Sequence, residues 1–97
     1  MKEVIVREEA ESDISRSYEW YESKREGLGA NFMLCVDEAF SRISRNPKHY
    51  PTLLNPVRRA FVKRFPYGVY YIEREKSIAV LAVLHSRQSP QHWKSRT

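Results

Sequence analysis

The sequence predicts an α+β domain in which two helices cover one face of a four-stranded antiparallel sheet. Two amphipathic helical patterns fill the first half of the chain, and three short runs rich in β-branched and aromatic residues fill residues 57–87. The chain has only 97 residues, which is enough for one hydrophobic core and too few for two. We therefore treat residues 1–97 as a single domain.

The chain begins with a short strand pattern. Val4, Ile5 and Val6 are apolar and lie between charged residues, as is typical of a short strand. So short a strand is not stable alone. We expect it to join the sheet formed later in the chain.

Residues 9–46 follow helical periodicity. The first helix is expected from Glu9 to about Glu26, and its apolar residues recur at intervals of four, four and three: Ala10, Ile14, Tyr18 and Tyr21. Gly27 and Gly29 should stop it. The second helix is expected from Asn31 to the Asn46-Pro47 pair, with a stripe of Phe32, Val36, Ala39 and Ile43. Together they predict an αα-hairpin.

Two large apolar side chains lie off these stripes. We interpret Trp20 as packing at a helix edge. Leu34 has two interpretations that the sequence does not separate: an isolated apolar residue on the surface, or part of a patch that binds a partner.

A proline-bounded loop at residues 49–56 leads into an antiparallel meander. Its first strand, residues 58–64, is rich in lysine and arginine, so we place it at an exposed sheet edge. Its last strand, residues 78–84, has no polar residue, so we place it inside the sheet.

An interior strand needs a neighbour on each side. The Val69–Ile72 strand supplies one, and the N-terminal strand is the candidate for the other. If every connection reverses the chain, the first and last strands run antiparallel, in the spatial order first, fourth, third, second (1-4-3-2). After the sheet, Ser89 to Trp93 favours a short terminal helix or a tethered tail.

Net charge narrows the classes of partner that the protein can bind. Lys and Arg number 17 against 12 Asp and Glu, which gives a formal charge of +5. This charge favours nucleic acid, an acidic protein segment or a membrane surface as the partner.

Composition also indicates the cellular environment. The single cysteine cannot form an intrachain disulfide and suits a reducing compartment. We expect a soluble cytoplasmic protein, because no apolar run is long enough for a membrane helix. No Cys/His or carboxylate cluster predicts a metal or cofactor.

Several short motifs, in this order, resemble the RelE/ParE superfamily of toxins from bacterial type II toxin–antitoxin systems, closer to the ParE-like, plasmid-stabilisation branch. The most specific are residues 64–71, Arg-Phe-Pro-Tyr-Gly-Val-Tyr-Tyr, and the ending from His85 to Trp93. The resemblance implies the fold described above and a small cytoplasmic toxin neutralised by a cognate antitoxin. The stoichiometry of any larger toxin–antitoxin assembly stays open.

The superfamily has two main activities. RelE-like members cleave mRNA on the ribosome, and ParE-like members poison DNA gyrase. Metal-independent RNA cleavage needs a deprotonated 2′-hydroxyl, a stabilised phosphate charge and a protonated leaving oxygen. The residues whose types suit this chemistry are Arg59, Lys63, His85 and Arg87.

Two positions depart from the ribonuclease pattern. RelE-like ribonucleases typically place a basic residue mid-strand where this chain has Phe61, and an arginine after the turn where it has Gly68. The missing arginine matters because a preorganised cation beside the developing charge carries much of such a rate enhancement. His85 is also explained without catalysis, as a hydrogen-bonded residue at a strand end.

The basic residues have three interpretations: a solvated, aggregation-resistant edge, a docking surface for an acidic antitoxin segment, or a contact with nucleic acid or the gyrase complex. The residues expected to contact the antitoxin or the target are Arg58, Arg59, Lys63, Arg64, Arg87 and Trp93. Trp93 is alternatively a packing anchor. We favour a non-enzymatic, ParE-like inhibitor of DNA gyrase. The alternatives are a ribosome-dependent mRNA endoribonuclease and a degenerate toxin that only binds its antitoxin.

Overall fold

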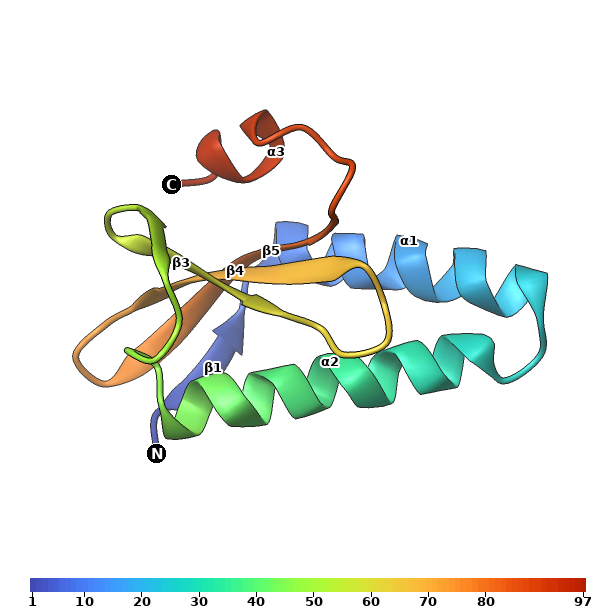
Figure 1. Cartoon of the computed structure of the whole chain (residues 1–97), viewed down its shortest axis with the longest axis horizontal. Helices are drawn as coiled ribbons and strands as arrows, with labels where there is room; N and C mark the ends of the chain where they lie inside the picture. Colours follow the sequence, from blue (N-terminus) through green and yellow to red (C-terminus); the bar gives the residue numbers. More distant parts are fainter.

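The computed structural model describes residues 1–97 and contains one sheet, two long helices and a short C-terminal helix (Figure 1). The elements in chain order are β1 (Glu3–Val6), α1 (Glu8–Lys24), α2 (Leu28–Arg45), β2 (Thr52–Leu54), β3 (Val57–Phe61), β4 (Tyr67–Glu73), β5 (Ser77–His85) and α3 (Gln91–Lys94). The helical hairpin packs on one face of the sheet, and α3 lies over the other face.

The sheet has five strands in the order β1-β5-β4-β3-β2. The predicted neighbours of β5 are confirmed, since it lies between β1 and β4. Two details of the prediction are wrong. β1 runs parallel to β5, with Val4 opposite Ile78, and the sheet contains the additional strand β2, where the sequence predicts a loop.

The additional strand β2 explains why β1 runs parallel to β5 and not antiparallel to it, as predicted. Each connection reverses the chain, and β2 adds one reversal between the helices and β3, so β5 returns parallel to β1. β2 also pairs with the outer side of β3, so the cationic strand is not the sheet edge. That strand ends at Phe61, and Lys63 and Arg64 belong to the turn before β4.

The turn between α1 and α2 depends on two glycines and one glutamate. Gly27 has a φ of 87° and precedes α2, which begins three residues earlier than predicted. The Glu22 carboxylate accepts the N–H groups of Gly27 and Gly29, each at 2.9 Å, which satisfies amides that have no partner inside the helix. Gly29 lies within α2, and a Cβ there would stand 2.8 Å from the Tyr18 carbonyl oxygen. The helices approach closely because position 29 has no side chain.

The core has one cluster on each face of the sheet. On the helical side the largest fully buried side chains are Phe32 and Tyr71. The other cluster contains Val57, Leu81 and Trp93. β5 contributes to both clusters, which explains why its sequence is apolar on both sides.

Two core tyrosines should ionise later than ordinary tyrosines. Burial raises the pKa of Tyr71 to about 12, and burial, followed by the neighbouring Tyr67, raises the pKa of Tyr21 to about 12. Both values exceed the ordinary 10.0, so folding favours the neutral phenols. Their contribution to stability is present below the unfolded-state pKa and is lost as the pH rises through the folded-state pKa.

An ultraviolet absorbance titration of tyrosinate will show this behaviour. We expect two tyrosines to ionise near pH 12 instead of near pH 10, and Tyr71→Phe to remove one of them. Ionisation of every tyrosine near pH 10 in the folded protein would contradict the expectation.

Candidate functional site

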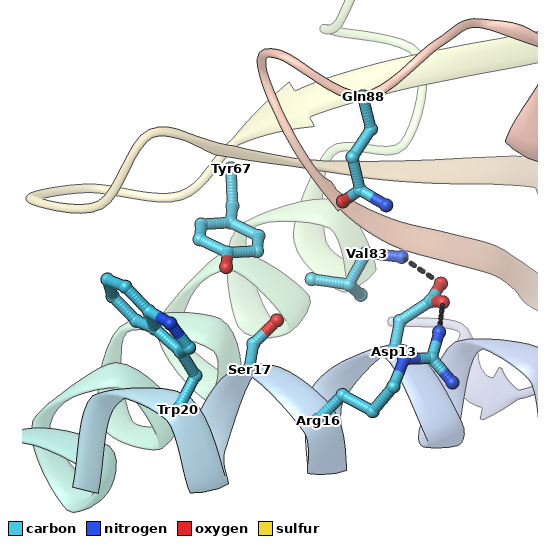
Figure 2. A pocket seen from close by; sticks show the side chains of 7 residues that line it. All are labelled: Asp13, Arg16, Ser17, Trp20, Tyr67, Val83 and Gln88. Atoms are coloured by element: carbon cyan, nitrogen blue, oxygen red, sulfur yellow. Dashed lines mark hydrogen bonds and ion pairs between the residues drawn. The ribbon is translucent and has the colours of Figure 1, made fainter. Parts of the chain in front are cut away.

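A groove runs between α1 and the end of β5. One part, about 150 Å³ in volume, is drawn in Figure 2 and is lined by Asp13, Arg16, Ser17, Trp20, Tyr67, Val83 and Gln88. The adjoining part, about 400 Å³, is lined by Trp20, Tyr21, Tyr67, His85 and Arg87. Because the two parts share Trp20 and Tyr67, we treat them as one surface and call it the α1 groove. The first part is polar and the second is largely aromatic.

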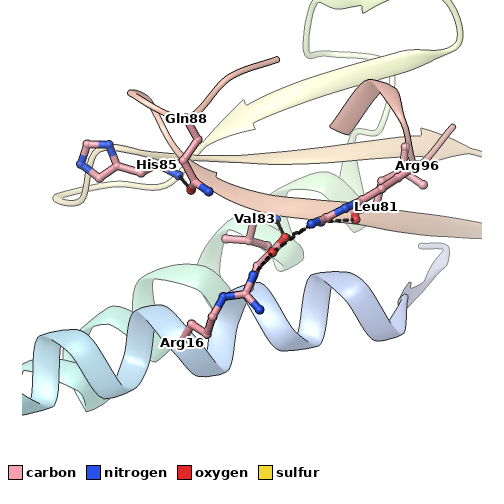
Figure 3. A network of polar contacts seen from close by, with 7 residues as sticks. Arg16, Leu81, Val83, His85, Gln88 and Arg96 are labelled. Carbon is pink, nitrogen blue, oxygen red and sulfur yellow. Dashed lines mark hydrogen bonds and ion pairs between the residues drawn. The ribbon is translucent and has the colours of Figure 1, made fainter. Parts of the chain in front are cut away.

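The polar part of the α1 groove is organised by Asp13, which is 4% exposed. Its carboxylate accepts hydrogen bonds from Arg96 at 2.6 and 3.2 Å, from Arg16 at 2.9 Å and from the Val83 N–H at 3.1 Å. The two guanidinium groups reach the carboxylate from different directions (Figure 3). We call these four residues the Asp13 network.

The Asp13 network closes an edge of the sheet. β1 pairs with β5 only as far as Val80, so the rest of β5 has no strand on that side. Side chains take the place of the strand: Arg96 donates to the Leu81 carbonyl oxygen at 3.2 Å, and Gln88 accepts the His85 N–H at 2.8 Å. These two contacts, and the hydrogen bond from the Val83 N–H to Asp13, occupy backbone groups of β5 that could otherwise pair with another strand.

Sequence reasoning missed Asp13, although the chain contains a signal for it. Asp13 adjoins Ile14 and falls three residues after Ala10, so it occupies the buried stripe of α1. A carboxylate on such a stripe requires a partner when it is buried. The partner is Arg96, which lies 83 positions further along the chain.

The structure distributes the four ribonuclease candidates over three places. His85 and Arg87 line the α1 groove. Lys63 points toward Glu38 of α2 at 3.9 Å. Arg59 lines a different groove, beside α3.

His85 makes local hydrogen bonds. Its Nδ1 accepts the Arg87 N–H at 3.0 Å, and its ring packs edge-on against Tyr67 with 5.3 Å between centroids. This geometry matches the alternative in which His85 is a hydrogen-bonded residue at the end of a strand.

Phe61 and Gly68, the two departures from the ribonuclease pattern, lie opposite each other in β3 and β4. The Arg59 guanidinium stands 4.5 Å from the centre of the Phe61 ring. A Cβ on Gly68 would stand 3.0 Å from the Arg59 Cδ. The stem of Arg59 therefore occupies the space that a side chain at position 68 would need.

The remaining predicted contact residues differ in accessibility. Arg58 donates to the carbonyl oxygens of Tyr50 and Lys48, at 2.6 and 3.3 Å, and so fastens the loop before β2. Trp93 is 4% exposed and stacks on Tyr70 at 5.5 Å, as its interpretation as a packing anchor requires. In this conformation Trp93 offers no surface to a partner.

A second exposed surface lies at the start of α2. There a cavity of about 340 Å³ is lined by Arg25, Leu28, Asn31, Leu34, Cys35, Arg64 and Phe65. Leu34 is 67% exposed, and Arg64 reaches this position through a left-handed backbone conformation with φ of 70°. Apolar area flanked by cations, without a carboxylate, suits an acidic amphipathic partner.

Residues 4–90 match the family described as "ParE toxin of type II toxin-antitoxin system, parDE". The chain belongs to the ParE toxin family. This ParE family member also resembles a solved structure described as "Chromosomal ParDE TA system from P. aeruginosa", with a TM-score of 0.77 and 16% identity over 88% of this chain and 96% of that one. At this identity the likeness concerns the fold. No curated protein matches the sequence.

Two features are absent from the ParE family member. No group of three or more His, Cys, Asp or Glu side chains is arranged to hold a metal ion. None of its helices combines the length and the apolar character needed to cross a membrane.

Proposed function

We propose that this ParE family member is a cytoplasmic toxin that inhibits DNA gyrase by binding it, and that a cognate antitoxin neutralises it. The observation that carries the proposal is the dispersal of Arg59, Lys63, His85 and Arg87 over three surfaces. Phosphodiester cleavage without a metal needs its acid, base and cation within reach of one phosphate. A protein-binding role makes no such demand.

Accessible apolar area beside cations supports binding. Trp20 is 55% exposed at the α1 groove, with the Lys24 ammonium 5.0 Å from its ring centre and Arg87 on the opposite wall. Aromatic and arginine side chains dominate the energetics of protein–protein interfaces. The α1 groove is therefore our candidate contact with gyrase. The exposed surface around Leu34 at the start of α2 is our candidate contact with the antitoxin.

Purified gyrase and ribosome-bound mRNA, treated in parallel with the toxin, test the proposal. We expect inhibited supercoiling with trapped DNA cleavage, intact mRNA, and at least about tenfold less inhibition by Arg87→Ala, because arginines at interface centres are often worth more than 1.4 kcal/mol. Arg74→Ala, which removes the same charge from the exposed β4–β5 turn, is the matched control. Adding the cognate antitoxin should restore supercoiling.

Two results would reject the gyrase proposal. Cleaved mRNA that is abolished by His85→Ala or Arg87→Ala, with gyrase unaffected, would establish the ribonuclease alternative. Inactivity toward both targets, with retained binding to the cognate antitoxin, would establish a degenerate toxin.

A further inference from the structure

Arg87 lines the α1 groove without an ionic partner in the protein. It is the only permanently charged side chain in the aromatic part of the groove, which is otherwise lined by Trp20, Tyr21, Tyr67 and His85. Arg87 is exposed and takes part in no ion pair. The direction of its guanidinium therefore depends on the backbone from which the side chain extends. A fixed backbone reduces the freedom that an arginine loses when it contacts a partner.

The backbone of Arg87 belongs to a tight turn from His85 to Gln88. The His85 carbonyl oxygen accepts the Gln88 N–H at 3.0 Å, and the Gln88 side-chain oxygen accepts the His85 N–H at 2.8 Å (Figure 3). The Pro66 carbonyl oxygen accepts the Ser86 N–H at 2.8 Å. The Arg87 N–H donates to His85 Nδ1 at 3.0 Å. Of these hydrogen bonds, only the last has a titratable acceptor.

That hydrogen bond requires the neutral form of His85. Because a backbone N–H can only donate, Nδ1 must carry a free lone pair, and the ring proton lies on Nε2. Protonated imidazole carries a proton on both nitrogens. Uptake of a proton therefore turns the acceptor of the Arg87 N–H into a second donor, and the hydrogen bond is lost. The new positive charge also repels the Arg87 guanidinium in the same part of the groove.

The groups around His85 do not stabilise a positive charge on its ring. β4 contributes Tyr67, whose ring lies 5.3 Å from that of His85, and α1 contributes Trp20 and Tyr21. Burial raises the pKa of Tyr21 to about 12, so this phenol is neutral in the range where histidine titrates. The further charge beside Trp20 is the ammonium of Lys24, which is also positive. No Asp or Glu lines this part of the groove.

The one carboxylate of the α1 groove is already bonded elsewhere. Asp13 accepts hydrogen bonds from Arg96, from Arg16 and from the Val83 N–H. Figure 3 shows the His85 ring directed away from these contacts. Asp13 is therefore not available as a partner for a protonated His85.

We propose that His85 is a positioning residue for the surface that inhibits gyrase: the neutral ring holds the backbone of Arg87, and protonation of His85 releases it. The inference rests on the proposed function, since it names the group that orients a contact residue of the α1 groove. Histidine ordinarily changes charge between about pH 5 and 8. The hydrogen bond is complete at the alkaline end of this range and lost at the acidic end, so inhibition weakens as the pH falls.

Two substitutions at position 85 separate the acceptor from the ring. Asparagine carries its Oδ1 oxygen at the same bond distance from Cα as Nδ1 of histidine, and it commonly accepts the N–H two residues further along the chain. Glutamine carries its oxygen one bond further out. Neither amide takes up a proton in this range. His85→Asn should therefore preserve the contact with Arg87 at every pH, whereas His85→Gln should lose it at every pH.

Inhibition of supercoiling, compared with His85→Asn at the same pH, removes the pH dependence of gyrase itself. We expect the unaltered protein to match His85→Asn at about pH 8 and to inhibit about fivefold less than it at about pH 6, the effect of one net hydrogen bond. His85→Gln should inhibit about fivefold less than His85→Asn at both values. In an Arg87→Ala background, substitution of His85 should have no further effect.

Amide NMR of the free toxin tests the hydrogen bond without gyrase. We expect the Arg87 amide resonance to shift with the ring resonances of His85 in the unaltered protein, and to be independent of pH in His85→Asn. His49→Asn and His92→Asn are matched controls, because both histidines are exposed and line no groove. Both controls should keep the pH dependence of the unaltered protein.

Two results would overturn the inference. One is an Arg87 amide that does not respond when His85 titrates in the unaltered protein. The other is gyrase inhibition whose pH dependence is the same in His85→Asn as in the unaltered protein. If the toxin does not inhibit gyrase at all, the NMR titration still decides whether His85 holds Arg87, so the inference and the proposed function fail separately.

Discussion

Replacing Asp13 by alanine will lower the free energy of unfolding by about 3–5 kcal/mol, because it leaves a charge and a backbone donor without their partner. The Asp13 side chain is 2% exposed and that of Arg96 is 16% exposed, so water cannot readily replace the lost contacts. The Val83 N–H also loses its acceptor. Arg16 contributes little, since its side chain is 67% exposed.

Urea denaturation followed by far-ultraviolet circular dichroism measures the effect. Asp37→Ala is the matched control, because Asp37 is an exposed helical aspartate, and it should change stability by less than about 0.5 kcal/mol. Removing Arg96 as well should cost less than the sum of the two single changes, since the double variant has no buried unpaired charge and only the exposed Arg16 loses its partner. Additive losses, or a minor effect of Asp13→Ala, would show that the buried pair is not coupled.

Replacing Phe32 by alanine will cost about 3–5 kcal/mol, the usual range for a fully buried phenylalanine. Phe32 is 0% exposed and contacts the rings of Tyr21, Phe65 and Tyr67 at centroid distances of 4.9 to 5.3 Å. Tyr21 and Tyr67 also line the α1 groove. The substitution should therefore loosen the groove as well as the core.

The matched control is Phe61→Ala, because Phe61 is 58% exposed and its loss leaves no buried cavity. We expect it to cost less than about 1 kcal/mol. Equal losses of stability in the two variants would contradict the assignment of Phe32 to the centre of the core.

The helices and the interior strand could be predicted because many residues repeat the same pattern. The apolar stripe from Phe32 to Ile43 repeats at helical spacing, so that face of the helix must be buried. The 78–84 segment is uniformly apolar, so both faces of that strand must be buried. β2 has only three residues between two proline-containing segments, which is too short for any period to show. Missing this one strand also reversed the predicted direction of β1.

The candidate site was less predictable because its contacts join distant parts of the chain. Asp13 and Arg96 are 83 positions apart, and nothing local to either residue identifies the other. Arg58 and Arg59 are neighbours in β3, and alternation along a strand points them to opposite faces, where Arg58 fastens a loop and Arg59 lines a groove beside α3. Alternation alone does not show that Arg58 satisfies backbone carbonyls while Arg59 has a buried donor without an acceptor.

The short reach of β1 along β5 has a consequence for synthesis. The contacts that complete this side of the molecule come from both ends of the chain, including a 2.9 Å hydrogen bond from the Arg7 guanidinium to the Arg96 carbonyl oxygen. Such long-range contacts form late, because the ribosome releases Arg96 after every strand. A nascent chain that does not yet include Arg96 has an uncapped edge beside α1.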